Sequence, residues 1–155
     1  MGDIKIELVY RPKELILIQE AAPGTTEWST LLTRLDSLDY FVLRLSRNGK
    51  EIEENYNKNV ERFERIMTYL GEGISGDIVL LSGEERIEPE QLLYVPSFGS
   101  SDATSILIVF KSYLSKRDGK FKVIFNGTAL RMGSHEFEYA IRSIKALPSL
   151  ETTGS

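Results

Sequence analysis

Two segments near the start of the chain have the hydrophobic pattern of β-strands. Between residues 3 and 10, apolar side chains alternate with charged ones, the period-two pattern of a strand that is buried on one face: Ile4, Ile6 and Leu8. Residues 14–20 form a denser apolar run that is also typical of a strand. We expect the two segments to pair as a hairpin around residues 11–13.

Two other segments repeat their apolar residues at helical spacing. The main helix is predicted over about residues 56–70, where the apolar positions follow the 3.6-residue period: Tyr56, Val60, Phe63, Met67 and Leu70. Two pairs of opposite charge four residues apart favour it: Glu54 with Lys58, and Glu61 with Arg65. Gly71 is placed to end it in a left-handed conformation. A short helix is predicted over about residues 26–36, where Trp28, Leu31, Leu32 and Leu35 recur.

The rest of the chain returns to strand patterns that are separated by turn residues. Residues 40–46 alternate apolar and polar positions and lead into Asn48-Gly49, a dipeptide typical of tight hairpin turns. Further strands are predicted over residues 77–81, 92–95, 104–111, 120–126 and 136–144, with turns at Ser82-Gly83, Asp118-Gly119 and Asn126-Gly127.

Seven to eight short strands with one main helix indicate an α+β, β-rich fold. A parallel sheet needs a helix between nearly every pair of strands, so we expect an antiparallel sheet or a two-sheet sandwich. No linker and no repeat divides the 155 residues, which predicts a single globular domain over 3–147 and a polar C-terminal tail over 148–155. The longest apolar runs are far shorter than the roughly 18 residues of a membrane span, so a soluble domain is expected.

Composition narrows the classes of partner and cofactor. The net charge is −4, and no window gathers the basic residues into a stripe that could follow phosphates, so we expect no nucleic-acid partner. The absence of cysteine excludes thiolate chemistry, and His135, the single histidine, excludes sites that need two. We interpret His135 as a residue of a turn or a strand edge, and we expect no metal and no cofactor.

One glycine pattern has the letters of a dinucleotide-binding fingerprint, Gly71-x-Gly73-x-x-Gly76. In that motif a strand precedes the glycines, and the phosphates lie on the N-terminus of the following helix. Here the predicted helix comes first and a strand follows, so the glycines lie at the negative end of a helix, which repels phosphate. We therefore interpret the pattern as a helix end followed by a loop.

Acidic residues provide candidates for hydrolytic chemistry. Glu136 and Glu138 share one face of a predicted strand, about 7 Å apart, a separation that suits a carboxylate-dependent hydrolase. The opposite face is apolar, so the two side chains also fit the solvent side of a half-buried strand. The acidic cluster at residues 84–90 is interpreted as a solvated turn. Asp36, Asp39 and Asp102 do not form the closely spaced ladder of an EF-hand calcium loop.

Aromatic side chains are the remaining candidates for recognition. Tyr94, Phe98 and Tyr113 flank residues 96–102, which have the composition of a surface loop and end in Asp102. Exposed aromatics on loops rich in Ser and Gly suit a recognition surface, and packing in the core is the alternative for the same rings. The candidate binding residues are Tyr94, Phe98, Asp102 and Tyr113, with Phe98 as the anchor. No residue is assigned a catalytic role.

Residues 40–141 contain the run from residue 40 to residue 52, the helix with Phe63 and Leu70, and the turn at residues 133–137 before a last strand. In these three features the chain resembles uncharacterised bacterial exported lipoprotein ectodomains. The resemblance implies a cell-envelope location, a binding or structural role, and membrane contact only through an N-terminal lipid anchor. We expect a non-catalytic domain that binds a protein or a small-molecule ligand. A small carboxylate-dependent hydrolase and a cytosolic adaptor are the alternatives.

Overall fold

The computed structural model describes residues 3–12, 37–94, 96–97 and 99–145, which form nine strands and several helices. One sheet contains β1 (Ile4–Arg11), β2 (Asp39–Arg47), β3 (Lys50–Glu51), β6 (Pro89–Tyr94) and β7 (Thr104–Phe110). The other contains β4 (Ile78–Ser82), β5 (Glu85–Ile87), β8 (Lys120–Asn126) and β9 (Ser134–Ala140). The α-helices are α3 (Val60–Gly71) and α4 (Ile141–Lys145). The 3-10 helices are η1 (Glu53–Tyr56), η2 (Gly73–Asp77), η3 (Leu114–Lys116) and η4 (Thr128–Leu130).

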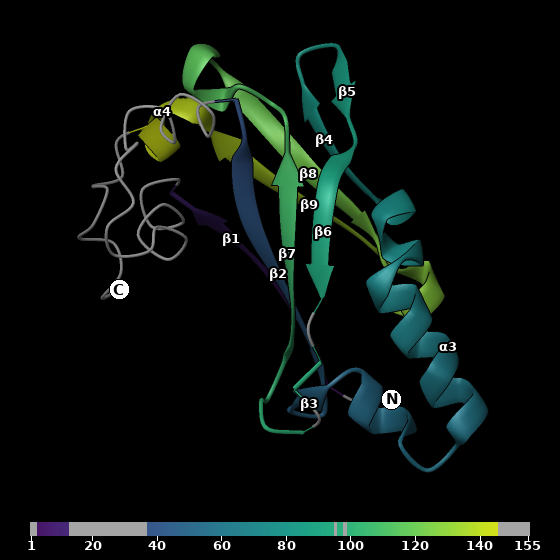
Figure 1. The fold of residues 1–155 in the computed structure, drawn as a ribbon. Coiled ribbons are helices and arrows are strands. Elements are labelled where there is room, and N and C mark those ends of the chain that lie inside the picture. The colour runs from purple at the N-terminus through teal and green to yellow at the C-terminus, as the bar shows by residue number, and fades with distance from the viewer. Residues whose placement is uncertain (1–2, 13–36, 95, 98, 146–155) are drawn as a thin grey trace, which may run out of the picture.

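The strands form two antiparallel sheets that face each other, with α3 alongside (Figure 1). The first sheet has the order β1-β2-β7-β6, with β3 also paired to β2, and the second has the order β5-β4-β8-β9. The predicted α+β, β-rich fold is confirmed, in its two-sheet form. In the described part of the chain, none of the helices has the length and hydrophobicity that a membrane span requires.

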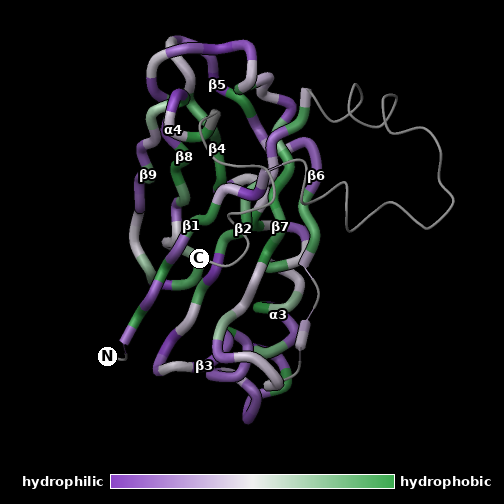
Figure 2. The backbone as a smooth tube through the Cα atoms, turned by 90° about the vertical axis from the view of Figure 1, so that its left-hand side faces the viewer, coloured by the Kyte–Doolittle hydropathy of each residue, from purple (hydrophilic) through white to green (hydrophobic). Residues whose placement is uncertain are grey.

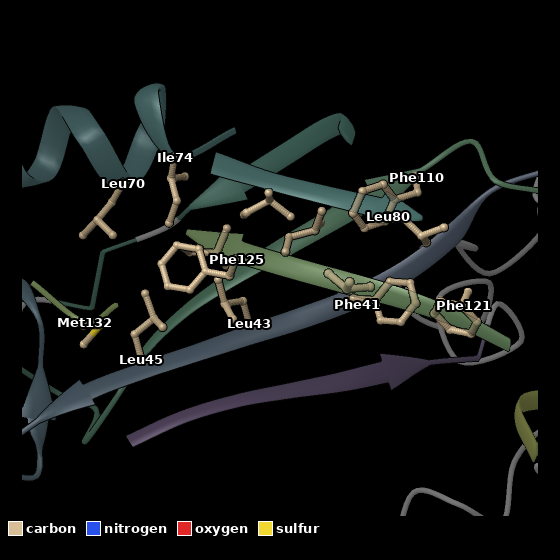
Figure 3. Close-up of a cluster of buried hydrophobic side chains, with 14 of the residues drawn as sticks. Phe41, Leu43, Leu45, Leu70, Ile74, Leu80, Phe110, Phe121, Phe125 and Met132 are labelled. Carbon is tan, nitrogen blue, oxygen red and sulfur yellow. The ribbon is translucent and has the colours of Figure 1, made fainter. Parts of the chain in front are cut away.

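The core lies between the two sheets because side chains alternate along each strand and the buried apolar side chains of both sheets meet there. Figure 2 shows hydrophobic residues along the central strands of both sheets. Phe41, Leu43 and Leu45 of β2 point toward Phe121 and Phe125 of β8 (Figure 3). Phe41 and Phe121 are in edge contact, with ring centroids 5.9 Å apart. The alternation that predicts the strands therefore also specifies the core.

A short crossing of the chain and a side-chain hydrogen bond both link the two sheets. β5 belongs to the second sheet and β6 to the first, with only Glu88 between them. Pro89 stands at this crossing, and the register of β6 on β7 shifts between Pro89 and Gln91, which bends the strand. At another edge, the Tyr139 hydroxyl of β9 donates a hydrogen bond of 2.9 Å to the carbonyl of Leu8 in β1.

The main helix differs from the predicted one at both ends. Residues 53–56 form η1, and α3 begins after Asn59, whose side chain accepts a hydrogen bond from the Arg62 N–H at 3.1 Å. The left-handed glycine cap is wrong, because Gly71 is still helical and Glu72 follows with φ −132°. Neither predicted ion pair of this segment lies within 4.0 Å among the described side chains.

One strand prediction and two turn predictions are also corrected. The last predicted strand ends at Ala140, and α4 follows, with Ile141 and Ile144 buried at helical spacing. The acidic cluster at residues 84–90 is solvated, but it forms β5 and the start of β6 as well as a turn. Asn126-Gly127 does not form a tight hairpin turn, because η4 separates β8 from β9.

Other predictions are confirmed or lie outside the described residues. Asn48 and Gly49 form the predicted hairpin turn, with φ values of 57° and 71°. β1 pairs with β2, while its predicted hairpin partner, residues 14–20, lies outside the described residues. The short helix predicted over 26–36 and the polar tail over 148–155 also lie outside them.

Candidate functional site

The predicted binding residues are divided between the two ends of β7. Tyr94 ends β6 and Asp102 lies in the connection from β6 to β7, whereas Tyr113 follows β7 at its far end (Figure 1). β7 has seven residues, which places Tyr113 on the order of 20 Å from the connection. Phe98 lies outside the described residues. The structure therefore brings Tyr94 and Asp102 to one loop and separates Tyr113 from it.

Two glutamates that the sequence analysis does not single out lie against this loop. Glu51 ends β3 and Glu53 begins η1, and each residue is only 1% exposed. Carboxylates are rarely buried this completely, because removing a charge from water is costly unless hydrogen bonds replace the lost hydration. Ile52, between them, is 1% exposed and faces the core, and its N–H donates a hydrogen bond of 2.8 Å to the Thr104 hydroxyl.

The Glu51 carboxylate holds the loop through both of its oxygens. Oε1 accepts a hydrogen bond from the Gly99 N–H at 2.6 Å, and Oε2 accepts one from the Ser97 hydroxyl. The Asn55 side-chain amide donates to the carbonyls of Glu51 and Arg47, at 3.1 and 3.2 Å. This amide fixes the turn that contains Glu51, so the position of the carboxylate that binds the loop is also fixed.

The Glu53 carboxylate links the two strand ends that flank the loop. Oε2 accepts a hydrogen bond from the Tyr94 hydroxyl, and Oε1 accepts one of 2.5 Å from the hydroxyl of Thr104, the first residue of β7. The Tyr94 hydroxyl also lies 3.2 Å from the Met67 sulfur of α3. Burial, the hydrogen bond to Glu53 and the charges of Glu53 and Glu51 raise the pKa of Tyr94 well above its ordinary value.

Neutral groups donate all of the hydrogen bonds to these two carboxylates. The donors are the hydroxyls of Tyr94, Ser97 and Thr104 and the N–H of Gly99. Within the described ranges, no basic side chain lies within 4.0 Å of either carboxylate. Each carboxylate oxygen has a donor, which is how a buried acid is satisfied without a cation.

This arrangement suits a structural role better than hydrolysis. A carboxylate-dependent hydrolase needs acids that face a cleft open to the substrate, whereas Glu51 and Glu53 are enclosed. Glu136 and Glu138, the pair predicted for this chemistry, are exposed on β9. They lie 3.6 Å from Lys122 and 3.9 Å from Lys120 respectively, as cross-strand ion pairs on the solvent face.

Asp102 connects the loop to the outer face of the first sheet. Its carboxylate accepts a hydrogen bond of 3.3 Å from Arg44 of β2, and Arg44 lies 3.7 Å from Glu7 of β1. Arg44 also lines an open cleft of about 500 Å³ on this face. The other residues of the cleft are Arg11, Val42, Leu93, Ser105 and Leu107. Leu93 is 56% exposed, so the cleft presents apolar surface next to the loop.

The remaining sequence candidates have local roles. His135 stands in β9, and its Nε2 lies 2.6 Å from the Met132 carbonyl, in agreement with the strand-edge interpretation. Gly71 is the last residue of α3, and Gly73 and Gly76 lie in η2, so the predicted helix end is followed by a 3-10 helix and not by an irregular loop. The buried Asp39 carboxylate accepts hydrogen bonds from the Ser112 hydroxyl and the Leu114 N–H, at 2.6 and 3.0 Å. Over the described ranges, no group of three or more His, Cys, Asp or Glu is placed to hold a metal ion.

The local sequence does little to predict that Glu51 and Glu53 are buried. Residues 51–54 read Glu-Ile-Glu-Glu after a hairpin turn, a composition that usually indicates a solvated segment. The one available signal is Ile52, an apolar residue that must reach the core. Its position there holds its two neighbours, Glu51 and Glu53, close to the protein surface.

Comparisons with protein-family models, curated proteins and solved structures find no match for this chain. Its function is therefore inferred from its own residues.

Proposed function

We propose that this chain is a non-catalytic domain that binds a protein partner through the loop of residues 96–102 and the adjoining cleft on the first sheet. The observation that carries the proposal is that the buried Glu51 carboxylate holds Ser97 and Gly99 of the loop, while the buried Glu53 carboxylate holds the two strand ends beside it. A buried acid is a poor source of stability compared with an apolar residue of the same size. Glu51 and Glu53 are explained if the loop conformation that they fix is itself needed.

A loop held in this way is prepared for binding. Ordering a loop at an interface reduces affinity, and a loop that is already ordered avoids this loss. Gly99 adopts φ +86°, a conformation that favours glycine. This backbone geometry and the hydrogen bonds to Glu51 thus define the positions of Ser97 and Gly99.

The cleft beside the loop has the mixed character of a protein interface. Leu93 presents an exposed apolar side chain, while Arg44 and Asp102 form an exposed ion pair between the cleft and the loop. Non-obligate interfaces combine apolar contacts with a polar rim in this manner. The pair between Arg44 and Asp102 contributes little to stability because the Asp102 side chain is 80% exposed, so both groups are available to a partner.

The alternatives have weaker support. The carboxylates predicted for hydrolysis, Glu136 and Glu138, lie on the solvent face of β9 near Lys122 and Lys120, as expected for surface ion pairs. The cell-envelope location, the lipid anchor and the cytosolic adaptor stay predictions from the sequence.

Phe98→Ala tests the binding proposal, with Tyr113→Ala as a matched aromatic control at the other end of β7. Immobilised wild-type domain and both variants are exposed to an extract of the source cells, and the retained proteins are quantified. We expect a protein that binds the wild type and Tyr113→Ala, with affinity for Phe98→Ala reduced by at least about 2 kcal/mol, roughly thirtyfold. The melting midpoint of Phe98→Ala should be nearly that of the wild type.

Two results would overturn the proposal. Equal retention by the wild type and Phe98→Ala would show that the loop is not the recognition surface. A large fall in the melting midpoint of Phe98→Ala would show that Phe98 packs in the core, where truncating an aromatic side chain costs roughly 3–5 kcal/mol.

A further inference from the structure

A second surface feature lies away from the loop, where the first turns of α3 approach the connection from β8 to β9 (Figure 1). The two elements enclose a cleft of about 380 Å³. Its lining residues are Tyr56, Arg62, Arg65, Ile66, Ala129 and Arg131. The volume lies within the range of small-molecule sites, roughly 300–1,000 Å³. Nothing in the loop proposal depends on this cleft.

Three of the six lining residues are arginines, and none is acidic. The Arg65 side chain donates a hydrogen bond of 3.4 Å to the backbone carbonyl of Glu61. In the described part of the chain, no carboxylate lies within 4.0 Å of the guanidinium groups of Arg62, Arg65 or Arg131. Glu61 and Glu64 line a neighbouring hollow together with Arg65, and they do not line this cleft. Three unneutralised positive charges therefore gather on a chain whose net charge is −4.

Arg131 occupies its place at a conformational disadvantage. Its φ is +58°, in the left-handed region that glycine and asparagine adopt more readily than arginine. Gly133, two residues later, also has a positive φ, of +74°, and there the residue is a glycine. A disfavoured conformation of a non-glycine residue is a reason to look for a function of its side chain. Here that conformation places a guanidinium group at the cleft.

The chemistry of the lining residues identifies a class of ligand. Guanidinium groups bind oxyanions through paired N–H donors, and phosphate offers several oxygens to more than one of them. Tyr56, Ile66 and Ala129 add an aromatic ring and apolar surface to the same cleft. We propose that this cleft binds a phosphate monoester of a small organic molecule. Arg62, Arg65 and Arg131 would contact the phosphate, and Tyr56 would pack against the organic group.

Titration of isotope-labelled protein with phenyl phosphate tests this proposal. The NMR signals to follow are the Nε–H groups of the three arginines and the amides of α3 and η4. We expect saturable shifts with phenyl phosphate, an affinity for inorganic phosphate roughly tenfold or more weaker because it lacks the apolar contacts, and no binding of phenol.

Two variants separate a specific site from general charge attraction. Arg131→Gly removes one guanidinium and also relieves the left-handed strain, so it should weaken phenyl phosphate binding at least roughly tenfold while the melting midpoint stays the same or rises. Arg142→Gln removes an equal charge at an exposed position on α4 and should leave the affinity unchanged.

Four results would overturn the proposal. Shifts that do not saturate would show that there is no defined site. Equal affinity of Arg131→Gly and the wild type would remove Arg131 from it. Equal weakening by Arg142→Gln would indicate attraction by overall charge. Inorganic phosphate that binds as tightly as phenyl phosphate would show an anion site with no place for an organic group.

Discussion

Glu51 and Glu53 show, at the scale of single residues, how a protein holds a buried acid without a cation. Hydrogen bonds to a charged acceptor are shorter and stronger than those between neutral groups. The cost of removing the charge from water opposes this gain, so the net stabilisation is small and the gain is in defined geometry. The geometry in question is that of Ser97 and Gly99, which donate hydrogen bonds to Glu51.

Tyr94→Phe tests this hydrogen-bond network through its pH dependence. The pKa of Tyr94 is raised, first by burial and then by its hydrogen bond to Glu53. A group whose pKa is higher in the folded state stabilises the fold fully below the unfolded pKa, near 10, and this stabilisation is lost as the pH rises through the folded pKa. We therefore expect the free energy of unfolding to fall less steeply above pH 10 in Tyr94→Phe than in the wild type.

Urea unfolding from pH 7 to pH 11 gives the free energy of unfolding at pH 7 and its dependence on pH. At pH 7, Tyr94→Phe should be about 1–2 kcal/mol less stable, because Glu53 loses a donor while the half-buried site admits some water. Tyr113→Phe serves as the control, since the Tyr113 residue is 39% exposed, and it should match the wild type at pH 7. An identical pH profile for Tyr94→Phe and the wild type would contradict the network.

The connection between β8 and β9 shows, at the scale of elements, how one side chain redirects a turn. The Asn126 side chain accepts hydrogen bonds from the N–H and the hydroxyl of Thr128, at 3.1 and 2.6 Å. These bonds compete with a tight hairpin turn and favour the single turn of η4. The Gly127 N–H then donates to the Gly133 carbonyl at 2.7 Å, which closes the connection.

Gly127→Ala tests how tightly this connection is packed. A Cβ atom at Gly127 would lie 2.7 Å from the Gly133 carbonyl oxygen and 2.9 Å from Met132 Cβ, so we expect a loss of about 1–3 kcal/mol. Gly71→Ala is the matched control, because no atom lies within 4 Å of its Cβ and the residue is helical. It should raise stability by up to about 1 kcal/mol in the same denaturation experiment. Equal effects of the two substitutions would show that the connection is loose.

Features that depend on neighbouring residues are predictable from the sequence, whereas features that depend on residues far apart along the chain are not. The alternation along β2, the apolar run of β7 and the helical period of α3 are local signals, so the elements and core side chains such as Phe41 and Ile108 are predictable. The pairing of β1 with β2 and the crossing from β5 to β6 depend on residues far apart in sequence. The acidic segment at residues 84–90 therefore has only the local composition of a turn, and β5 forms because β4 provides a partner for it.

The candidate site is less predictable for the same reason. Tyr94 and Asp102 are recognisable as loop residues, but the acids that fix the loop precede Gly99 by more than forty positions. The separation of Tyr113 from Tyr94 follows from the length and direction of β7, which only the folded chain defines. The positive cleft likewise needs Arg131 to meet Arg62 across two distant segments.

At the scale of the whole molecule, two sheets share one core and the loop of residues 96–102 is attached to it through side chains. β2 supports β3 and hence Glu51, while β7 supplies Thr104 to Glu53. The first sheet therefore carries both the buried carboxylates and the loop between β6 and β7. We expect the loop backbone to share the protection of the sheet rather than to open independently of it.

Amide hydrogen exchange, measured residue by residue, tests this claim most directly. The Gly99 N–H donates to the buried Glu51 carboxylate at 2.6 Å, so we expect it to exchange at least roughly tenfold more slowly in the wild type than in Glu51→Ala. The amides of β2 and β7 should stay protected in both proteins, and Glu51→Gln, which keeps an acceptor oxygen, should lie between them. Equal exchange of Gly99 in the wild type and Glu51→Ala, with both strands still protected, would contradict the account.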